Sequence, residues 1–189
     1  GLHGGHSGVD IHLGRMNANK EMFRFLKEAV SEYEARLASY SGGTLRNAIP
    51  REAEAVVTIL AEDKEDFMDA VNDFAATLKR EYGFIEENLY FTAEQTELPH
   101  SLLPEEIQDD LINAIVACHN GVYRMIPDAP DVVETSSNLS IVRTSEGYIE
   151  VKILVRSSSE SMKRALASEL ESTFSLAGAR VDFDGAYPG

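Results

Sequence analysis

Apolar residues recur along this chain with two different periods, and segments of the two kinds alternate. Spacing of three and four residues predicts amphipathic helices, and alternation or β-branched runs predict strands. The helical pattern is found near residues 19–37, 64–82, 104–118 and 159–177. The strand pattern is found at residues 9–13, 34–40, 55–60, 88–92 and 179–183. Two more strands are predicted on either side of Ser145-Glu146-Gly147, which is a hairpin signal.

Short polar motifs predict where several of these elements begin and end. Asn17 is suited to cap the first helix, and Ser157-x-x-Glu160 resembles a capping box at the start of the last. Asn120-Gly121 is suited to end the third helix, and residues 127–130 read as a turn.

The order of these elements predicts an α+β fold. Residues 1–95 have the order β-α-β-β-α-β of a split β-α-β, ferredoxin-like unit, and residues 96–189 repeat α-β-β-α-β. We therefore expect two tandem ferredoxin-like units that share a mainly antiparallel sheet, with all the helices on one face.

Alternation in the second strand of the hairpin gives Arg156 a particular position. Ile149, Val151, Ile153 and Val155 share one face of that strand, which we expect the helices to cover. Arg156 then points to the open face, where a guanidinium can bind an anionic ligand. An ordinary surface charge is the alternative interpretation.

Two glycine-rich loops carry further candidate residues. His6 lies within Gly1-Leu2-His3-Gly4-Gly5-His6-Ser7-Gly8, and Asn47 follows Gly42-Gly43. Glycine lets backbone approach a ligand closely, so His6 is a candidate hydrogen-bond donor and Asn47 a candidate donor and acceptor. A flexible turn with an incidental histidine and a loop-capping asparagine are the alternatives. A metal site formed by His3, His6 and His12 is a further alternative, without a supporting carboxylate pair or cysteine.

Composition narrows the classes of function. The chain has 189 residues, a hydrophobic content of 43% and a net charge of -15, so a globular domain is expected and nucleic acid and anionic membranes are disfavoured as partners. The one cysteine, Cys118, indicates a reduced, cytoplasmic setting without disulfides. No H-x-D, H-E-x-x-H or G-x-S-x-G motif occurs, so the chain lacks complete catalytic machinery. Its glycine-rich ends, without an initiating methionine, suggest a domain excised from a longer protein.

Several motifs in order resemble the bacterial aminoacyl-histidine dipeptidases, which are cytoplasmic two-zinc exopeptidases related to carnosinase and carboxypeptidase G. The resemblance runs from Gly1 to Gly189 and covers only the lid, or dimerisation-type, domain of that family. It rests on residues 1–12, 17–20, 42–53, 133–139, 155–157 and 185–189.

The resemblance implies roles for individual residues. His6 matches the lid histidine that stabilises the oxyanion at the scissile carbonyl. Asn47 matches an asparagine that contacts the substrate, and Arg156 matches the arginine that binds the substrate's terminal carboxylate. Thr135 matches a polar residue in contact with the substrate.

The implied reaction is hydrolysis of Xaa-His dipeptides at a site with two zinc ions. The catalytic domain that holds the zinc flanks this segment, so the isolated chain is expected to bind no catalytic metal and to be inactive. The implied partners are a dipeptide, the protein's own catalytic domain and a second copy of the chain, whose active site is an alternative target for His6. A free-standing ferredoxin-like module for ligand binding or dimerisation, without catalysis, is the alternative function.

Overall fold

The computed structural model describes residues 1–185 and confirms the predicted helices. They are α1 (Ala18–Tyr33), α2 (Lys64–Tyr82), α3 (Glu105–Ala117) and α4 (Glu160–Leu176). Asn17 caps α1 as predicted, because its side-chain oxygen accepts hydrogen bonds from the backbone N–H groups of Asn19 and Lys20 at 3.0 and 3.1 Å.

The predicted capping box at α4 is wrong. Ser159 is the cap, and its hydroxyl accepts a hydrogen bond from the N–H of Met162 at 3.3 Å. Ser157 instead ends the preceding strand, and its hydroxyl accepts a hydrogen bond from the N–H of Ser159 at 3.0 Å. The N-cap of the helix is therefore two residues later than the motif suggested.

The strands pair in antiparallel fashion, as predicted. The larger sheet has five strands, β2 (Arg36–Gly42), β4 (Ala53–Thr58), β5 (Gly121–Ile126), β6 (Ala129–Ser145) and β7 (Tyr148–Ser157). β6 is 17 residues long and pairs with β7 along one side. On its other side it pairs with β5 near its beginning and with β2 near its end. β1 (Gly5–His6) and β3 (Ala48–Ile49) form a separate two-stranded sheet.

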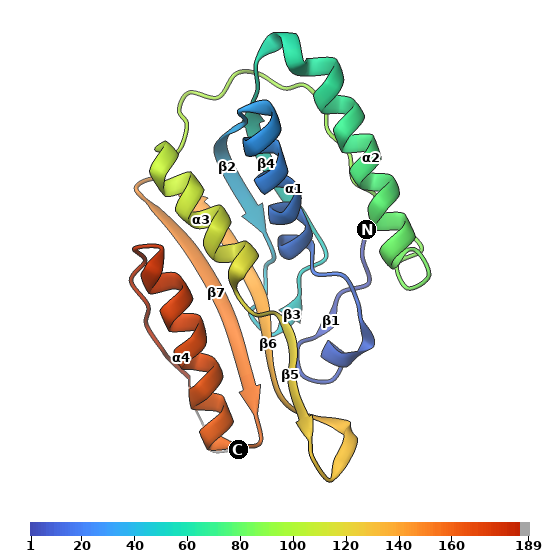
Figure 1. Ribbon diagram of the computed structural model, residues 1–189, viewed down its shortest axis with the longest axis vertical. Helices are drawn as coiled ribbons and strands as arrows, with labels where there is room; N and C mark the ends of the chain where they lie inside the picture. The colour runs from blue at the N-terminus through green and yellow to red at the C-terminus, as the bar shows by residue number, and fades with distance from the viewer. Residues whose placement is uncertain (186–189) are drawn as a thin grey trace.

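Helices lie on one face of the large sheet, which confirms the α+β prediction. Figure 1 shows α1, α3 and α4 in front of the strands, with α2 beside α1. The main core joins these three helices to the sheet through Phe23, Leu26, Ile112, Ile115, Leu139, Val142, Leu166 and Leu170. A second cluster holds α2 against α1, where the ring of Phe25 lies 5.8 Å from Phe67 and 5.3 Å from Phe74.

The two halves of the chain share this sheet and core. β2 from the first half pairs with β6 from the second through Ser41 opposite Arg143 and Gly42 opposite Val142. Residues 1–95 and 96–189 as separate units stay a prediction.

Three predicted strands are wrong. Residues 11–13 form a 3-10 turn, and residues 88–92 and 179–183 have no ladder partner among residues 1–185. Side-chain packing accounts for their apolar residues without pairing. The Phe91 ring lies 5.0 Å from both Phe25 and Phe74, and Val181 packs against the main core. Gly14, in a left-handed conformation with φ of 73°, ends the 3-10 turn.

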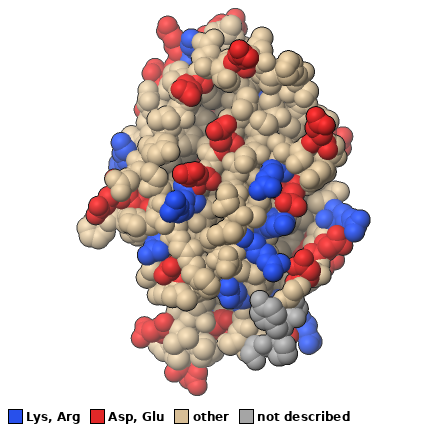
Figure 2. Space-filling view, turned by 180° about the vertical axis from the view of Figure 1, so that it is seen from behind, with Lys and Arg blue, Asp and Glu red and all other residues tan. Residues whose placement is uncertain are grey.

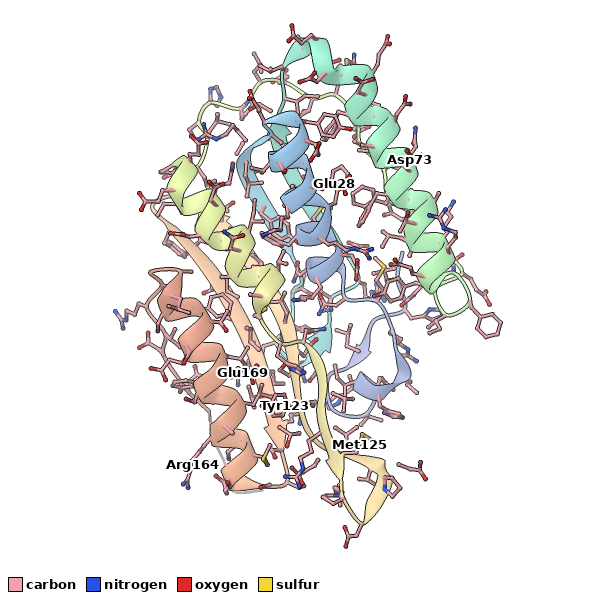
Figure 3. All side chains as sticks on the ribbon, viewed as in Figure 1. Glu28, Asp73, Tyr123, Met125, Arg164 and Glu169 are labelled. Atoms are coloured by element: carbon pink, nitrogen blue, oxygen red, sulfur yellow. The ribbon has the colours of Figure 1, made fainter. Side chains whose placement is uncertain are left out.

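β5 is a strand that the sequence pattern did not predict. It follows the predicted helix end at Gly121, and its Tyr123 lies beside Glu169 of α4 (Figure 3). A hydrogen bond from Tyr123 to the Glu169 carboxylate raises the pKa of the phenol. This contact joins the hairpin of β5 and β6 to the last helix.

The first turn of α1 carries a buried amide that holds two strands. The Asn19 side chain is fully buried, and its oxygen accepts a hydrogen bond from the Tyr40 hydroxyl at 2.9 Å. Its amide nitrogen donates to the carbonyls of Gly42 at 3.3 Å and Ser140 at 3.5 Å. A Cβ at Gly42 would overlap the Asn19 side chain, so this approach requires glycine.

Replacing Asn19 should therefore destabilise the fold. In Asn19→Ala the Tyr40 hydroxyl stays buried without its acceptor, and we expect the free energy of unfolding to fall by about 1–3 kcal/mol. Urea denaturation measures this change. Asn72→Ala, at an exposed position of α2, is the matched control and should change stability by less than about 0.5 kcal/mol. Equal stability of the two variants would contradict the role given to Asn19.

Candidate functional site

The glycine-rich segment before α1 is folded tightly around two arginines. Gly4 and Gly5 have φ values of 64° and 142°, which disfavour other residues. A Cβ at Gly4 would overlap the Arg51 side chain, and one at Gly5 would lie 2.7 Å from an Asp10 carboxylate oxygen. Arg15 donates a hydrogen bond to the Gly4 carbonyl at 2.7 Å. The segment thus has a defined shape, and its glycines permit these close contacts.

His6 is exposed at the end of β1, and its ring is oriented by backbone. Its Nδ1 accepts hydrogen bonds from the N–H groups of Gly8 at 3.0 Å and Val9 at 3.1 Å. The backbone N–H of His6 donates to the Asp10 carboxylate at 2.8 Å. Because Nδ1 is an acceptor, the proton of the neutral ring lies on Nε2. His6 can therefore donate a hydrogen bond from Nε2 to a ligand.

Asn47 lies in the loop between β2 and β3, next to His6. Its carbonyl accepts a hydrogen bond from the N–H of Ser7 at 3.0 Å. Its side chain is exposed and makes no hydrogen bond within residues 1–185. The loop is fixed from below, because Ser140 donates to the Arg46 carbonyl and Asn138 donates to the Ala48 carbonyl at 2.8 Å. The backbone at Asn47 is thus held in place, and both polar groups of its side-chain amide are available.

Arg156 joins these residues from β7. Ile149, Val151, Ile153 and Val155 pack against the helix-covered core, so Arg156 faces the other side of the sheet, as predicted. Its Nε donates to the Ser7 hydroxyl at 3.3 Å. A Cβ at Gly8 would lie 3.1 Å from Cδ and Nε of Arg156 and 3.3 Å from Cε1 of His6. The side chains of His6 and Arg156 therefore both lie against Gly8.

Thr135 is not brought to the same place. In the ladder it is opposite Ser157, whereas Ser136 is opposite Arg156, so Thr135 lies on the other face of the sheet. Its buried hydroxyl lies 2.8 Å from the Ser157 hydroxyl and 3.1 Å from a Glu134 oxygen. Substrate contact by Thr135 stays a prediction.

Basic side chains surround the three clustered residues although the chain is acidic. Figure 2 shows Lys and Arg gathered on the helix-free side of the molecule, with acidic residues among them. Arg15 pairs with Asp10 at 3.5 Å, and Arg46 pairs with Asp184 at 3.1 Å. These two arginines are thus paired with carboxylates.

Metal ligation is not supported in the described part of the chain. No group of three or more His, Cys, Asp or Glu side chains within residues 1–185 could hold a metal ion. The alternative site of His3, His6 and His12 does not form, since Nδ1 of His3 lies 2.9 Å from the Glu86 carboxylate and Nδ1 of His6 accepts backbone hydrogen bonds.

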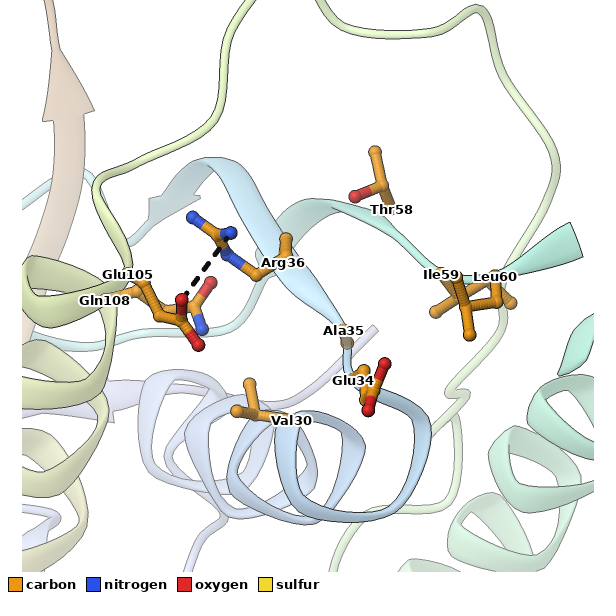
Figure 4. Close-up of a pocket in the computed structure, with 9 residues that line it drawn as sticks. All are labelled: Val30, Glu34, Ala35, Arg36, Thr58, Ile59, Leu60, Glu105 and Gln108. Atoms are coloured by element: carbon orange, nitrogen blue, oxygen red, sulfur yellow. Dashed lines mark ion pairs between the residues drawn. The ribbon is translucent and has the colours of Figure 1, made fainter.

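Two hollows elsewhere contain none of the predicted site residues. One lies at the far end of α1, where Arg36 of β2 is 4.0 Å from Glu105 of α3 (Figure 4). The other is an acidic groove between α1 and α2, lined by residues that include Glu28 and Asp73 (Figure 3). The helices of residues 1–185 are also too short or too polar to cross a membrane.

Known proteins resemble this chain in sequence and in overall fold. Residues 1–86 match the family described as a peptidase dimerisation domain. Over 189 residues the chain is 40% identical to the cytosol non-specific dipeptidase of Escherichia coli (strain K12) and covers 39% of it. The crystal structure of aminoacylhistidine dipeptidase from Vibrio alginolyticus matches with a TM-score of 0.97 and 41% identity, over 100% of this chain and 38% of that one. The chain thus spans about two-fifths of the length of these relatives.

The His6 hydrogen bonds predict its tautomer. In long-range proton–nitrogen NMR spectra of the neutral ring, Nε2 should carry the proton and Nδ1 should have the shift of an unprotonated acceptor. His100, which is exposed, is the internal control and should show a mixture of tautomers. A proton found mainly on Nδ1 of His6 would contradict the orientation described above.

Proposed function

Residues 1–86 of this chain match the peptidase dimerisation-domain family, and from that match we propose that the chain is the substrate-binding lid of a dipeptidase. Both solved and curated relatives carry the name dipeptidase. The proposed reaction is hydrolysis of dipeptides, with Xaa-His dipeptides as the substrate class. A catalytic domain outside this chain would supply the rest of the active site.

The proximity of His6 and Arg156 is the observation that carries the proposal. Both side chains lie against Gly8, so an Nε2–H donor and a guanidinium are available to one small ligand. In a dipeptide the scissile carbonyl and the terminal carboxylate are one residue apart, and each further residue would move the carboxylate by about 3.3–3.6 Å. A fixed, short separation between the two groups therefore favours dipeptides over longer peptides.

The three residues then have different roles. Arg156 binds the terminal carboxylate with its terminal guanidinium nitrogens, in a charge-assisted contact. His6 donates its Nε2 proton toward the charge that develops on the scissile carbonyl oxygen. Asn47 contacts the bound substrate through its exposed amide. These groups recognise features that every dipeptide has. In the proposed enzyme this chain therefore selects substrates by their length more than by their side chains.

The metal chemistry belongs to another part of the protein. The described residues do not fit a zinc site, so we place the two proposed zinc ions in the flanking catalytic domain. We also propose a homodimer, because the matched family is named for dimerisation, and a cytoplasmic location, because the curated relative is named as cytosolic.

Arg156 gives the first test of this proposal. In the full-length enzyme, Arg156→Ala should lower kcat/KM for a dipeptide by about 10- to 150-fold, which corresponds to loss of about 1.5–3 kcal/mol from a charged hydrogen bond. Arg156→Lys should also impair the enzyme because lysine lacks the planar fork. Steady-state kinetics provide the measurement. Arg164→Ala, at an exposed position of α4 (Figure 3), is the control and should leave the rate unchanged.

His6 gives a second test with a different kinetic signature. An oxyanion donor acts mainly in the transition state, so His6→Ala should lower kcat by roughly 100- to 1,000-fold while KM changes less. His100→Ala, which removes an exposed histidine far from the site in sequence, is the control. A His6→Ala enzyme with a kcat near that of the parent would rule out the assigned role.

A further inference from the structure

We propose that Ser7 and Gly8 are positioning residues that orient the Arg156 and His6 side chains and hold them beside the backbone of Asn47. The inference rests on the proposed function, because it concerns the same site. Neither residue needs to touch the substrate. Each makes contacts to two of the groups that do.

Ser7 connects Asn47 to Arg156. Ser7 is only 1% exposed although it directly follows the exposed His6. Its N–H donates to the Asn47 carbonyl at 3.0 Å, and its hydroxyl oxygen accepts from Nε of Arg156 at 3.3 Å. The backbone N–H and the hydroxyl of Ser7 are thus both hydrogen-bonded to residues of the site.

The Ser7 contact determines how Arg156 presents its guanidinium. Arginine can meet a carboxylate through Nε and one terminal nitrogen, or end-on through both terminal nitrogens. Because Nε of Arg156 already donates to Ser7, the end-on pair remains for the ligand. Loss of the Ser7 hydroxyl would free Nε and let the planar group rotate away from the carboxylate.

Gly8 holds Arg156 and His6 at close spacing. Its N–H is one of the two donors to Nδ1 of His6. Its missing side chain leaves space that a Cβ would take, 3.1 Å from Arg156 and 3.3 Å from the His6 ring. Gly8 does not have a positive φ, so alanine can adopt its backbone conformation. The effect of Gly8→Ala should therefore come from displacement of these two side chains by a few tenths of an ångström, rather than from backbone strain.

The experiment compares two substrates in the full-length enzyme. Alanyl-histidine has the terminal carboxylate, and its C-terminal amide does not. Ser7→Ala should lower kcat/KM for alanyl-histidine by roughly 3- to 10-fold, as expected for one lost hydrogen bond, mostly through KM. It should leave the rate on the amide unchanged, and it should add nothing in an Arg156→Ala background.

Gly8→Ala should give a different pattern, because it displaces both side chains. We expect kcat to fall on both substrates through His6, with a larger loss on alanyl-histidine through Arg156. The ratio of the two rates does not depend on the fraction of folded enzyme, so partial unfolding of a variant cannot imitate either result. Ser137→Ala is the matched control, since Ser137 is also 1% exposed but its hydroxyl contacts His119, and it should leave the ratio unchanged.

The outcomes separate the two proposals. If Arg156→Ala and His6→Ala leave hydrolysis intact, the proposed function is wrong. If these two variants behave as expected but Ser7→Ala lowers the rate equally on both substrates, or on neither, then Ser7 is a structural residue and the positioning role is overturned. An unchanged ratio in Gly8→Ala would overturn the role of Gly8 in the same way.

Discussion

Asn17 and Asn19 bring four separate segments to one point beneath the candidate site. The Asn17 amide caps α1 through its oxygen, while its nitrogen donates to the Leu139 carbonyl at 3.0 Å and to Asn120 at 3.2 Å. Asn19 links the end of β2 to Ser140. These amides are buried, so each lost partner would leave a polar group without water. The arrangement is consequently specific, and the loop that carries Asn47 is built directly on it.

The position of the site follows from this support. The side chains of Ser140 and Asn138 donate hydrogen bonds to the Arg46 and Ala48 carbonyls, respectively. These bonds fix the loop to β6. In this loop the Asn47 carbonyl accepts a hydrogen bond from the N–H of Ser7. Buried side chains thus hold the backbone of the loop, and the loop in turn holds Ser7.

The sequence predicted the helices well because their apolar stripes are long and each packs into one of two apolar clusters. It failed at residues 88–92 and 179–183 because an apolar run can pack against a core without strand pairing, as the partly buried Phe91 and Val181 do. The face of Arg156 followed from alternation, whereas the glycine-rich loops made His6 and Asn47 candidates and the resemblance implied their roles. Ser7 and Gly8 could not be found in this way, since their contacts join positions about 150 and 40 residues apart in the chain and a glycine pattern does not show which side chain fills the space.

The length of β6 has a consequence for how the domain can move. This one strand is hydrogen-bonded to β7 on one side and to both β2 and β5 on the other, so bending it would break ladders with three neighbours at once. Asn138 and Ser140 lie in its middle and carry the loop beside the site. In the proposed lid role we therefore expect the large sheet to rotate as one body over a ligand, with the hinge outside the ladders that β6 joins.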